Sequence, residues 1–120
     1  MENQIQRVIE MAQYIEHILC SQFEVMASWG YHNPKAVLFF GKPSLMFSVN
    51  GFLHTGDVVI SYNAGDDAFD VYLCKNNAVE KTITLVYLDE LVRRIDEEVE
   101  TKNPNSIAYQ KQVYEFINNI

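Results

Sequence analysis

The stretch Leu45–Cys74 constrains the fold of this 120-residue chain more than any other part of the sequence. In residues 69–74, FDVYLC, and in residues 58–63, VVISYN, the side chains alternate with the period of a β-strand. Asn50-Gly51 has the composition of a tight turn, because both residues accept a positive φ. Short strands joined by such turns pair antiparallel, since parallel pairing needs a crossover of about a dozen residues or more. The stretch therefore predicts an antiparallel meander.

Two more strands are predicted beside this stretch. Ala36–Phe40 is an apolar run rich in strand formers, and the turn-forming sequence Gly41–Ser44 follows it. Val79–Leu85 has the composition of a last strand. In the middle of the meander the chain either turns back directly after Asn50-Gly51 or forms a longer loop up to Val58. The longer loop is favoured, because Val58 starts the better strand.

Three segments outside the strands are predicted to be helices. Apolar residues recur every three or four positions in residues 3–22, 87–100 and 106–119. Asn103-Pro104 separates the last two, since proline disfavours helical backbone at the residue before it. Residues 23–29, FEVMASW, alternate with a period of two and favour a strand, but an extension of the first helix into this segment stays open.

The order of these elements predicts an α+β protein with a single domain, residues 1–120. We expect a two-layer α/β sandwich with an N-terminal helix, a four- to five-stranded antiparallel meander sheet and two C-terminal helices. The helices should all cover one face of the sheet, because each must bury its apolar stripe. The residues expected between the two layers are Phe47, Val58, Ile60, Phe69, Val71 and Leu73.

Composition and charge argue against several classes of protein. The net charge is −7 and the nine basic residues are scattered, whereas chains that bind the phosphate backbone of nucleic acids gather Lys and Arg into stripes. No run approaches the roughly 18 apolar residues of a membrane helix, so no membrane contact is expected. The first residues, MENQIQ, lack the features of a signal peptide, and Cys20 and Cys74 have no metal-ligand spacing. We therefore expect a reduced, cytoplasmic protein.

Three residues are weak candidates for a pocket near residues 51–57: His32, His54 and Asp57, which lie in predicted loops. Their spacing is not that of a metal site, and they are also explained as ordinary loop residues. The sequence has no nucleophile elbow, P-loop or dinucleotide-binding glycine motif. We therefore predict no catalytic residue, metal ligand or cofactor. A small-molecule-binding domain or minor enzyme that uses this pocket is the alternative function.

The second face of the predicted sheet, away from the helices, is the leading candidate for function. It would show Met26, Met46, Val59 and Tyr72. This mixture is too apolar for a plain solvent-facing surface, and Met and Tyr are enriched at protein interfaces. Scattered exposed apolar side chains, however, are also ordinary on a protein surface. The sequence predicts a non-catalytic protein-interaction, adaptor or regulatory module whose partner is another protein or a second copy of itself.

Four carboxylates, Asp96–Glu98 and Glu100, crowd the end of the second predicted helix, where the helix dipole disfavours them. They either present an acidic surface to a basic partner or form a solvated helix end. Two observations would separate the candidate functions. A polar pocket that combined His54 with Asp57 would favour small-molecule binding, whereas a flat apolar patch around Met46 and Tyr72 would favour protein binding.

Overall fold

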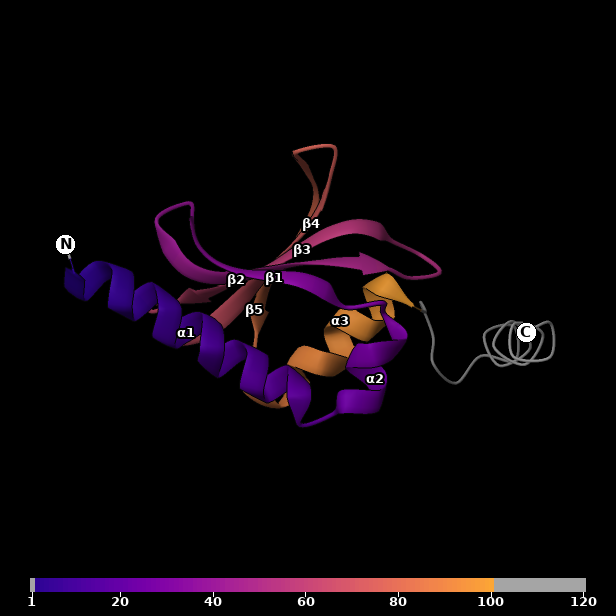
Figure 1. Cartoon of the computed structure of the whole chain (residues 1–120), viewed down its shortest axis with the longest axis horizontal. Coiled ribbons are helices and arrows are strands. Elements are labelled where there is room, and N and C mark those ends of the chain that lie inside the picture. Colours follow the sequence, from indigo (N-terminus) through magenta and orange to yellow (C-terminus); the bar gives the residue numbers. More distant parts are fainter. Residues whose placement is uncertain (1, 101–120) are drawn as a thin grey trace.

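A computed structural model describes residues 2–100, which form one antiparallel sheet with helices packed against one face (Figure 1). The elements are α1 (Glu2–Cys20), α2 (Phe23–Ser28), β1 (His32–Phe39), β2 (Lys42–Asn50), β3 (Thr55–Asn63), β4 (Ala68–Lys75), β5 (Ala78–Val86), the 3-10 turn η1 (Leu88–Glu90) and α3 (Leu91–Val99). The predicted α+β class and antiparallel meander are confirmed. The helix predicted over residues 106–119 lies outside the described residues.

The five strands follow one another in the sheet in chain order, β1-β2-β3-β4-β5, and every neighbouring pair is antiparallel. The first hairpin closes with the pair Phe39 and Lys42, so its turn contains only Phe40 and Gly41. Their φ angles of 50° and 75° are those of a type I′ turn, whose twist matches that of the strands. The predicted turn over Gly41–Ser44 is therefore wrong in its position. The turn lies at Phe40-Gly41, and β2 already begins at Lys42, so the strands are longer than expected.

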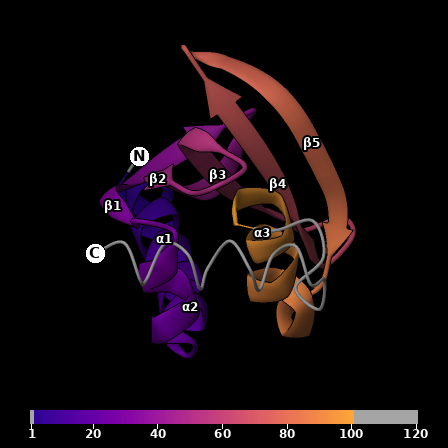
Figure 2. The same cartoon turned by 90° about the vertical axis from the view of Figure 1, so that its right-hand side faces the viewer.

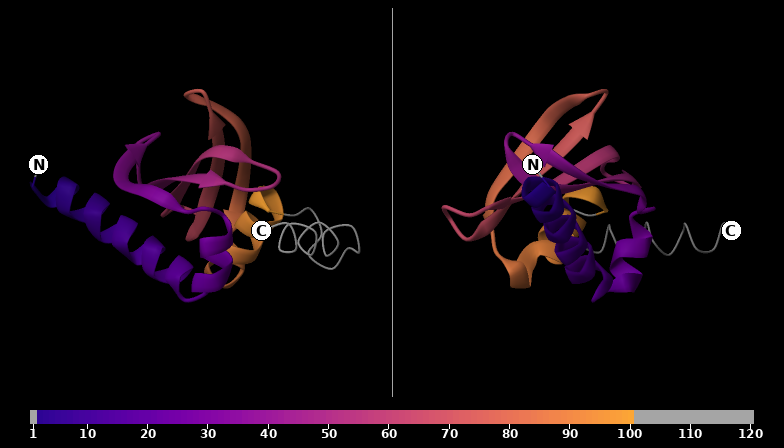
Figure 3. Two further views of the ribbon diagram at one scale, coloured as in Figure 1. Left: turned by 45° about the vertical axis from the view of Figure 1, so that its right-hand side comes forward. Right: turned by 60° about the vertical axis from the view of Figure 1, so that its left-hand side comes forward.

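The helices all lie on the same side of the sheet, as two further views show (Figure 3). α1 packs on β1 and β2, and α3 contacts α1 and α2. Trp29 stacks on Phe47 with ring centroids 6.3 Å apart, and Tyr31 lies 4.7 Å from the same ring. Trp29 and Phe47 are fully buried, and burial of a large apolar side chain such as Phe47 stabilises the fold by roughly 1.5–3 kcal/mol. All six residues predicted for this inner layer are buried there: Phe47, Val58, Ile60, Phe69, Val71 and Leu73.

Residues 23–29 form a short helix and its C-terminal cap, not a strand and not an extension of α1. α2 buries Met26 and Trp29, which are three residues apart and so lie on one helical face. Phe23, which the alternating pattern would bury, is exposed. The indole Nε1–H of Trp29 donates to Asp96 Oδ1 of α3 at 2.9 Å, so the helix is fixed by tertiary contacts that its sequence period does not reveal.

The loop between β2 and β3 contains four residues, 51–54, and β3 begins three residues before the predicted Val58. The backbone N–H groups of Leu53 and His54 both donate to the carbonyl of Val99, at 2.8 and 3.3 Å. The loop thereby satisfies a carbonyl that the end of α3 leaves without a helical partner. Gly51 makes this contact possible, because a Cβ at that position would lie 2.3 Å from the Val99 oxygen.

Candidate functional site

The face of the sheet opposite the helices, which we call the outer face, brings together three of the four residues predicted for an interaction surface. Met46 of β2 is the cross-strand partner of Val59 of β3, and Val59 is the partner of Tyr72 of β4. Directly opposed side chains on neighbouring strands are close enough to contact each other. The three residues therefore form a continuous row across the centre of the sheet.

Aromatic side chains from the first hairpin extend this row. The ring of Phe39 lies 4.7 Å from that of Phe40 and 4.8 Å from that of Tyr72, and Phe40 lies 5.6 Å from Tyr72. Val59 and Tyr72 are buried beneath the group, Phe39 and Met46 are half-buried, and Phe40 is 73% exposed. We call these five residues the outer patch: Phe39, Phe40, Met46, Val59 and Tyr72. The described helices all lie on the other face of the sheet (Figure 2).

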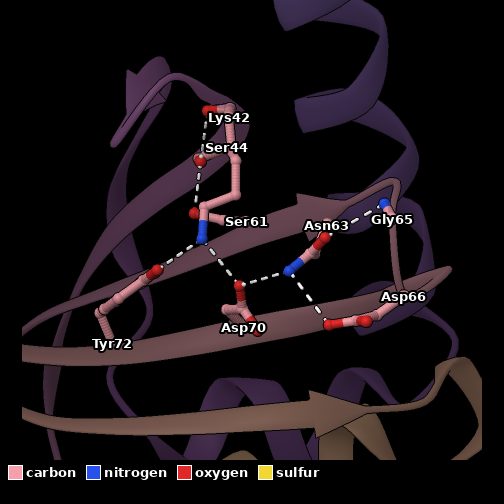
Figure 4. Close-up of polar contacts among 8 residues, drawn as sticks. All are labelled: Lys42, Ser44, Ser61, Asn63, Gly65, Asp66, Asp70 and Tyr72. Carbon is pink, nitrogen blue, oxygen red and sulfur yellow. Dashed lines mark hydrogen bonds and ion pairs between the residues drawn. The ribbon is translucent and has the colours of Figure 1, made fainter.

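A polar network borders the outer patch and fixes Tyr72 (Figure 4). Lys42 Nζ lies 2.7 Å from Asp70 Oδ2, donates to the hydroxyl of Tyr72 at 2.6 Å, and stands 5.2 Å from the centre of the Tyr72 ring. Burial opposes the charge of Lys42, but its hydrogen bonds to Asp70 and Tyr72 prevail and raise its pKa. Lys42 thus stays charged and neutralises Asp70, so the rim of the patch carries a satisfied ion pair.

Further hydrogen bonds connect this network to the neighbouring turn and strands. Asn63 Nδ2 donates to Asp70 Oδ2 at 3.4 Å and to Asp66 Oδ2 at 3.3 Å. The hydroxyls of Ser44 and Ser61, both buried, share a hydrogen bond of 2.6 Å between β2 and β3. The polar part of the outer face is therefore internally satisfied.

Met26 does not join the outer patch. It lies on α2, is 5% exposed, and packs in the core between the helices and the sheet. Its expected place on the outer face depended on a strand over residues 23–29, which the chain does not form. Met26 therefore stabilises the fold from the opposite side of the sheet.

The three pocket candidates lie in one corner of the sheet but do not converge on a cavity. His54 is buried, with Nε2 3.2 Å from the backbone oxygen of Asp57. The carboxylate of Asp57 accepts from the hydroxyl of Ser48 at 2.8 Å. His32 belongs to β1 rather than to a loop, is exposed, and has Nδ1 2.6 Å from the oxygen of Gly30. Each candidate already has a local hydrogen-bond partner.

A hollow of about 580 Å³ lies beside the predicted pocket, between the β2–β3 loop, the β4–β5 hairpin and α3. It contains His54, but neither His32 nor Asp57 lines it. The residues that line it are Leu53, His54, Leu73, Glu80, Lys81, Glu97 and Glu98. Lys81 and Glu98 pair with each other across it at 2.8 Å, so they do not present free charges to a ligand.

The carboxylates at the end of α3 do not form a free acidic surface. Glu98 pairs with Lys81, and Glu97 pairs with Arg93 at 2.7 Å. Glu100 is only 5% exposed, and burial, with a smaller effect from the charge of Asp96, raises its pKa to about 7. Burial also raises the pKa of Asp96, although the hydrogen bond from Trp29 opposes this. Glu98 and Asp96 thus connect α3 to β5 and α2, whereas Glu97 pairs within the helix.

The sequence placed Asp70 on the outer face, but it did not single out Phe40 or Lys42, and it did not pair Lys42 with Asp70. Lys42 and Asp70 are 28 residues apart in the chain, and only the order and register of β2, β3 and β4 bring them together. Phe40 carried one available signal, an aromatic side chain directly before a turn glycine. The residue at this position of a type I′ turn is usually Asn or Asp, because these residues accept a positive φ.

Within residues 2–100, no helix is long and apolar enough to cross a membrane. The same part of the chain contains no group of three or more His, Cys, Asp or Glu side chains that is placed to hold a metal ion. Comparisons of the chain with protein-family models, with curated proteins and with solved structures found no match.

Proposed function

We propose that this chain is a non-catalytic protein-interaction module that binds a protein partner through the outer patch. The observation that carries the proposal is the backbone conformation and the exposure of Phe40. This residue combines a φ of 50° with an exposed fraction of 73%, in a turn where Asn would be favoured over a bulky aromatic. Its ring contacts Phe39 and Tyr72, but most of the side chain stays in solvent and the backbone does not favour phenylalanine here, so a contact outside the chain accounts best for its presence.

The composition of the outer patch supports a protein as the partner. Aromatic residues and Met are enriched at the centre of protein interfaces, where charged residues are depleted. Phe40 offers a large exposed ring, and Lys42 holds the neighbouring Tyr72 in place through its hydroxyl. A preorganised aromatic surface loses little side-chain entropy on binding, which favours its use as an anchor. An exposed aromatic side chain beside Met46 and Tyr72 supports protein binding rather than a polar ligand site.

A small-molecule site is the second candidate, and the hollow beside His54 favours it. Its size of about 580 Å³ falls within the range of ligand pockets, but it is lined by an ion pair and open to solvent. Such sites are usually mostly apolar with a few converging polar groups. We therefore rank it below the outer patch. In either case we propose a cytoplasmic location for the protein.

The proposal is tested by placing a photoreactive phenylalanine analogue at position 40 of the full chain, expressed in its native cell. The matched control carries the same analogue at Tyr87, which is 50% exposed and lies beyond the end of β5. We expect illumination to give discrete crosslinked protein products at position 40 and not at position 87. Equal product patterns at the two positions would contradict a specific role for the outer patch.

A further inference from the structure

The sheet is open, and β1 and β5 are its two edge strands (Figure 2). An edge strand has a row of backbone N–H and C=O groups without a neighbour, and proteins usually protect such edges from pairing with another chain. The two edges of this sheet differ in how well they are protected. This difference points to the place where a second chain can add.

β5 has several protective features along its length. Glu80 and Lys81 place charges in the strand, its pairing with β4 shifts register twice, and Leu85 has a φ of 55° that bends the backbone. Charges and bulges of this kind make an edge a poor template for another strand. β5 is therefore a guarded edge.

Among the described residues 2–100, features that protect β1 lie in its first half. Asn33 has a φ of 58°, Pro34 lacks an N–H group, and the register with β2 shifts between His32 and Lys35. The second half, residues 36–39, has regular pairing with β2 and only apolar side chains: Ala36, Val37, Leu38 and Phe39. Leu38 is 47% exposed. A regular, apolar and unguarded edge segment of this kind is a pairing site.

The hairpin turn determines which backbone groups of this segment face outward. In a two-residue turn the closing residues, Phe39 and Lys42, form a hydrogen-bonded pair, and the pairs then alternate along the ladder. Val37 therefore bonds to β2, whereas Ala36 and Leu38 direct their N–H and C=O groups away from it. Pro43, the partner of Leu38, fits this alternation, because a residue in a non-hydrogen-bonded pair needs no N–H toward β1.

We infer that residues 36–38 of β1 pair antiparallel with the same residues of a second copy of this chain, about a two-fold axis at Val37. Ala36 of each copy then faces Leu38 of the other, and the outward groups form four backbone hydrogen bonds. Val37 faces Val37 in a non-hydrogen-bonded pair, and Lys35 faces Phe39. The pattern is self-complementary, and it sets no like charges opposite each other, which matters in a chain of net charge −7.

This inference deepens the proposed function and rests on it, because pairing would join the two outer patches into one surface. Phe39 lies on the outer face in both copies, beside Lys35 of the other, an arrangement that suits a cation–π contact. Pairing over so short a segment covers less than the roughly 800 Å² per partner of a stable interface. The dimer should therefore form and dissociate with protein concentration.

The test is a crosslink that depends on the register. In the full chain with Cys20→Ser, which removes the exposed thiol, Val37→Cys would place two cysteines opposite each other. Their Cα atoms would be about 4.5 Å apart, within the disulfide range. The control is Thr84→Cys on the guarded β5 edge, at an exposed position that is not the cross-strand partner of Cys74. We expect the Val37→Cys variant to form a covalent dimer at least about tenfold faster than the control variant. Equal rates of dimer formation for the two variants overturn the inference.

Light scattering on the unmodified chain provides the second measurement. We expect the mean mass to rise from 13.9 kDa toward twice that value with concentration. Leu38→Pro removes two of the four hydrogen bonds but none to β2, so it should weaken the dimer about tenfold or more while circular dichroism stays unchanged. A monomeric mass at all concentrations overturns the dimer. If the Phe40 photo-crosslink still captures another protein, the proposed function survives that result.

Discussion

Replacing Lys42 by Met tests whether the network beside the outer patch holds Asp70 and Tyr72 in place. The substitution keeps most of the side-chain stem and removes the ammonium group. The Asp70 side chain is 6% exposed, and without Lys42 its nearest donor is Asn63 Nδ2 at 3.4 Å, a weak hydrogen bond. The carboxylate would then be buried without a cation.

The magnitude follows from the burial of the pair. Removing one partner of a fully buried ion pair costs about 3–5 kcal/mol, because the other charge is left uncompensated. The Lys42 side chain is 24% exposed, so water can reach part of the site and reduce the cost. We therefore expect Lys42→Met to lower the free energy of unfolding by about 2–3 kcal/mol at neutral pH.

Urea unfolding is the assay, with Lys35→Met as the matched control. Lys35 lies on the neighbouring strand and is exposed, so its loss should change the free energy of unfolding by no more than about 0.5 kcal/mol. The double variant Lys42→Met, Asp70→Asn should lose at least about 1 kcal/mol less than the sum of the single variants, because the pair is removed together. A Lys42→Met protein as stable as the Lys35→Met control would refute the reasoning.

The network also predicts a dependence on alkaline pH. The pKa of Lys42 is raised in the folded protein above its ordinary value of 10.5. Its contribution to stability is therefore complete below that value and is lost as the pH rises through the folded pKa. The stability difference between the natural chain and Lys42→Met should shrink in this alkaline range. A difference that stays constant to high pH would contradict this.

Two further predictions concern the junction between the β2–β3 loop and α3. Gly51→Ala should lower the free energy of unfolding by about 2 kcal/mol or more, because the new Cβ would lie 2.3 Å from the Val99 oxygen. Gly65→Ala serves as the control, because a Cβ at that position would have no atom nearer than 3.4 Å. Glu100 has a pKa of about 7 against 4.5 for the free group, so the folded state prefers its protonated form and loses stability as the pH rises through 7. Glu100→Gln should therefore melt at the same temperature as the natural chain near pH 4 but at a higher temperature near pH 8; identical melting curves at both pH values would exclude this assignment.

The strands were predictable from the sequence, because a period of two over six residues is a local signal. The segment that contains Phe69, Val71 and Leu73 forms β4 with the expected face toward the helices. Strand ends were less well predicted, since pairing with neighbours extended β2 and β3 beyond their periodic parts. Residues 23–29 were assigned wrongly. Their helical state depends on the burial of Trp29 and its hydrogen bond to Asp96, 67 residues away.

The candidate surface was predictable in part. The alternation along β2, β3 and β4 placed Met46, Val59 and Tyr72 on one face, and the register aligns them. Lys42 was missed because its partner Asp70 comes close only through the strand order. Phe40 was missed because the turn was expected after it rather than at it. Contacts set by register and turn position cannot be derived from periodicity alone.

The central claim, that Phe40 is present for binding rather than for folding, is tested most directly by Phe40→Asn. Asn followed by Gly41 is the preferred sequence for this type I′ turn, and this gain offsets the loss of the ring contacts with Phe39 and Tyr72. The variant should therefore keep the stability of the natural chain to within about 1 kcal/mol, measured by urea unfolding. We predict that this stable protein no longer retains the partners that crosslink at position 40. A loss of clearly more than about 1 kcal/mol, or unchanged partner binding by the stable variant, would contradict the claim.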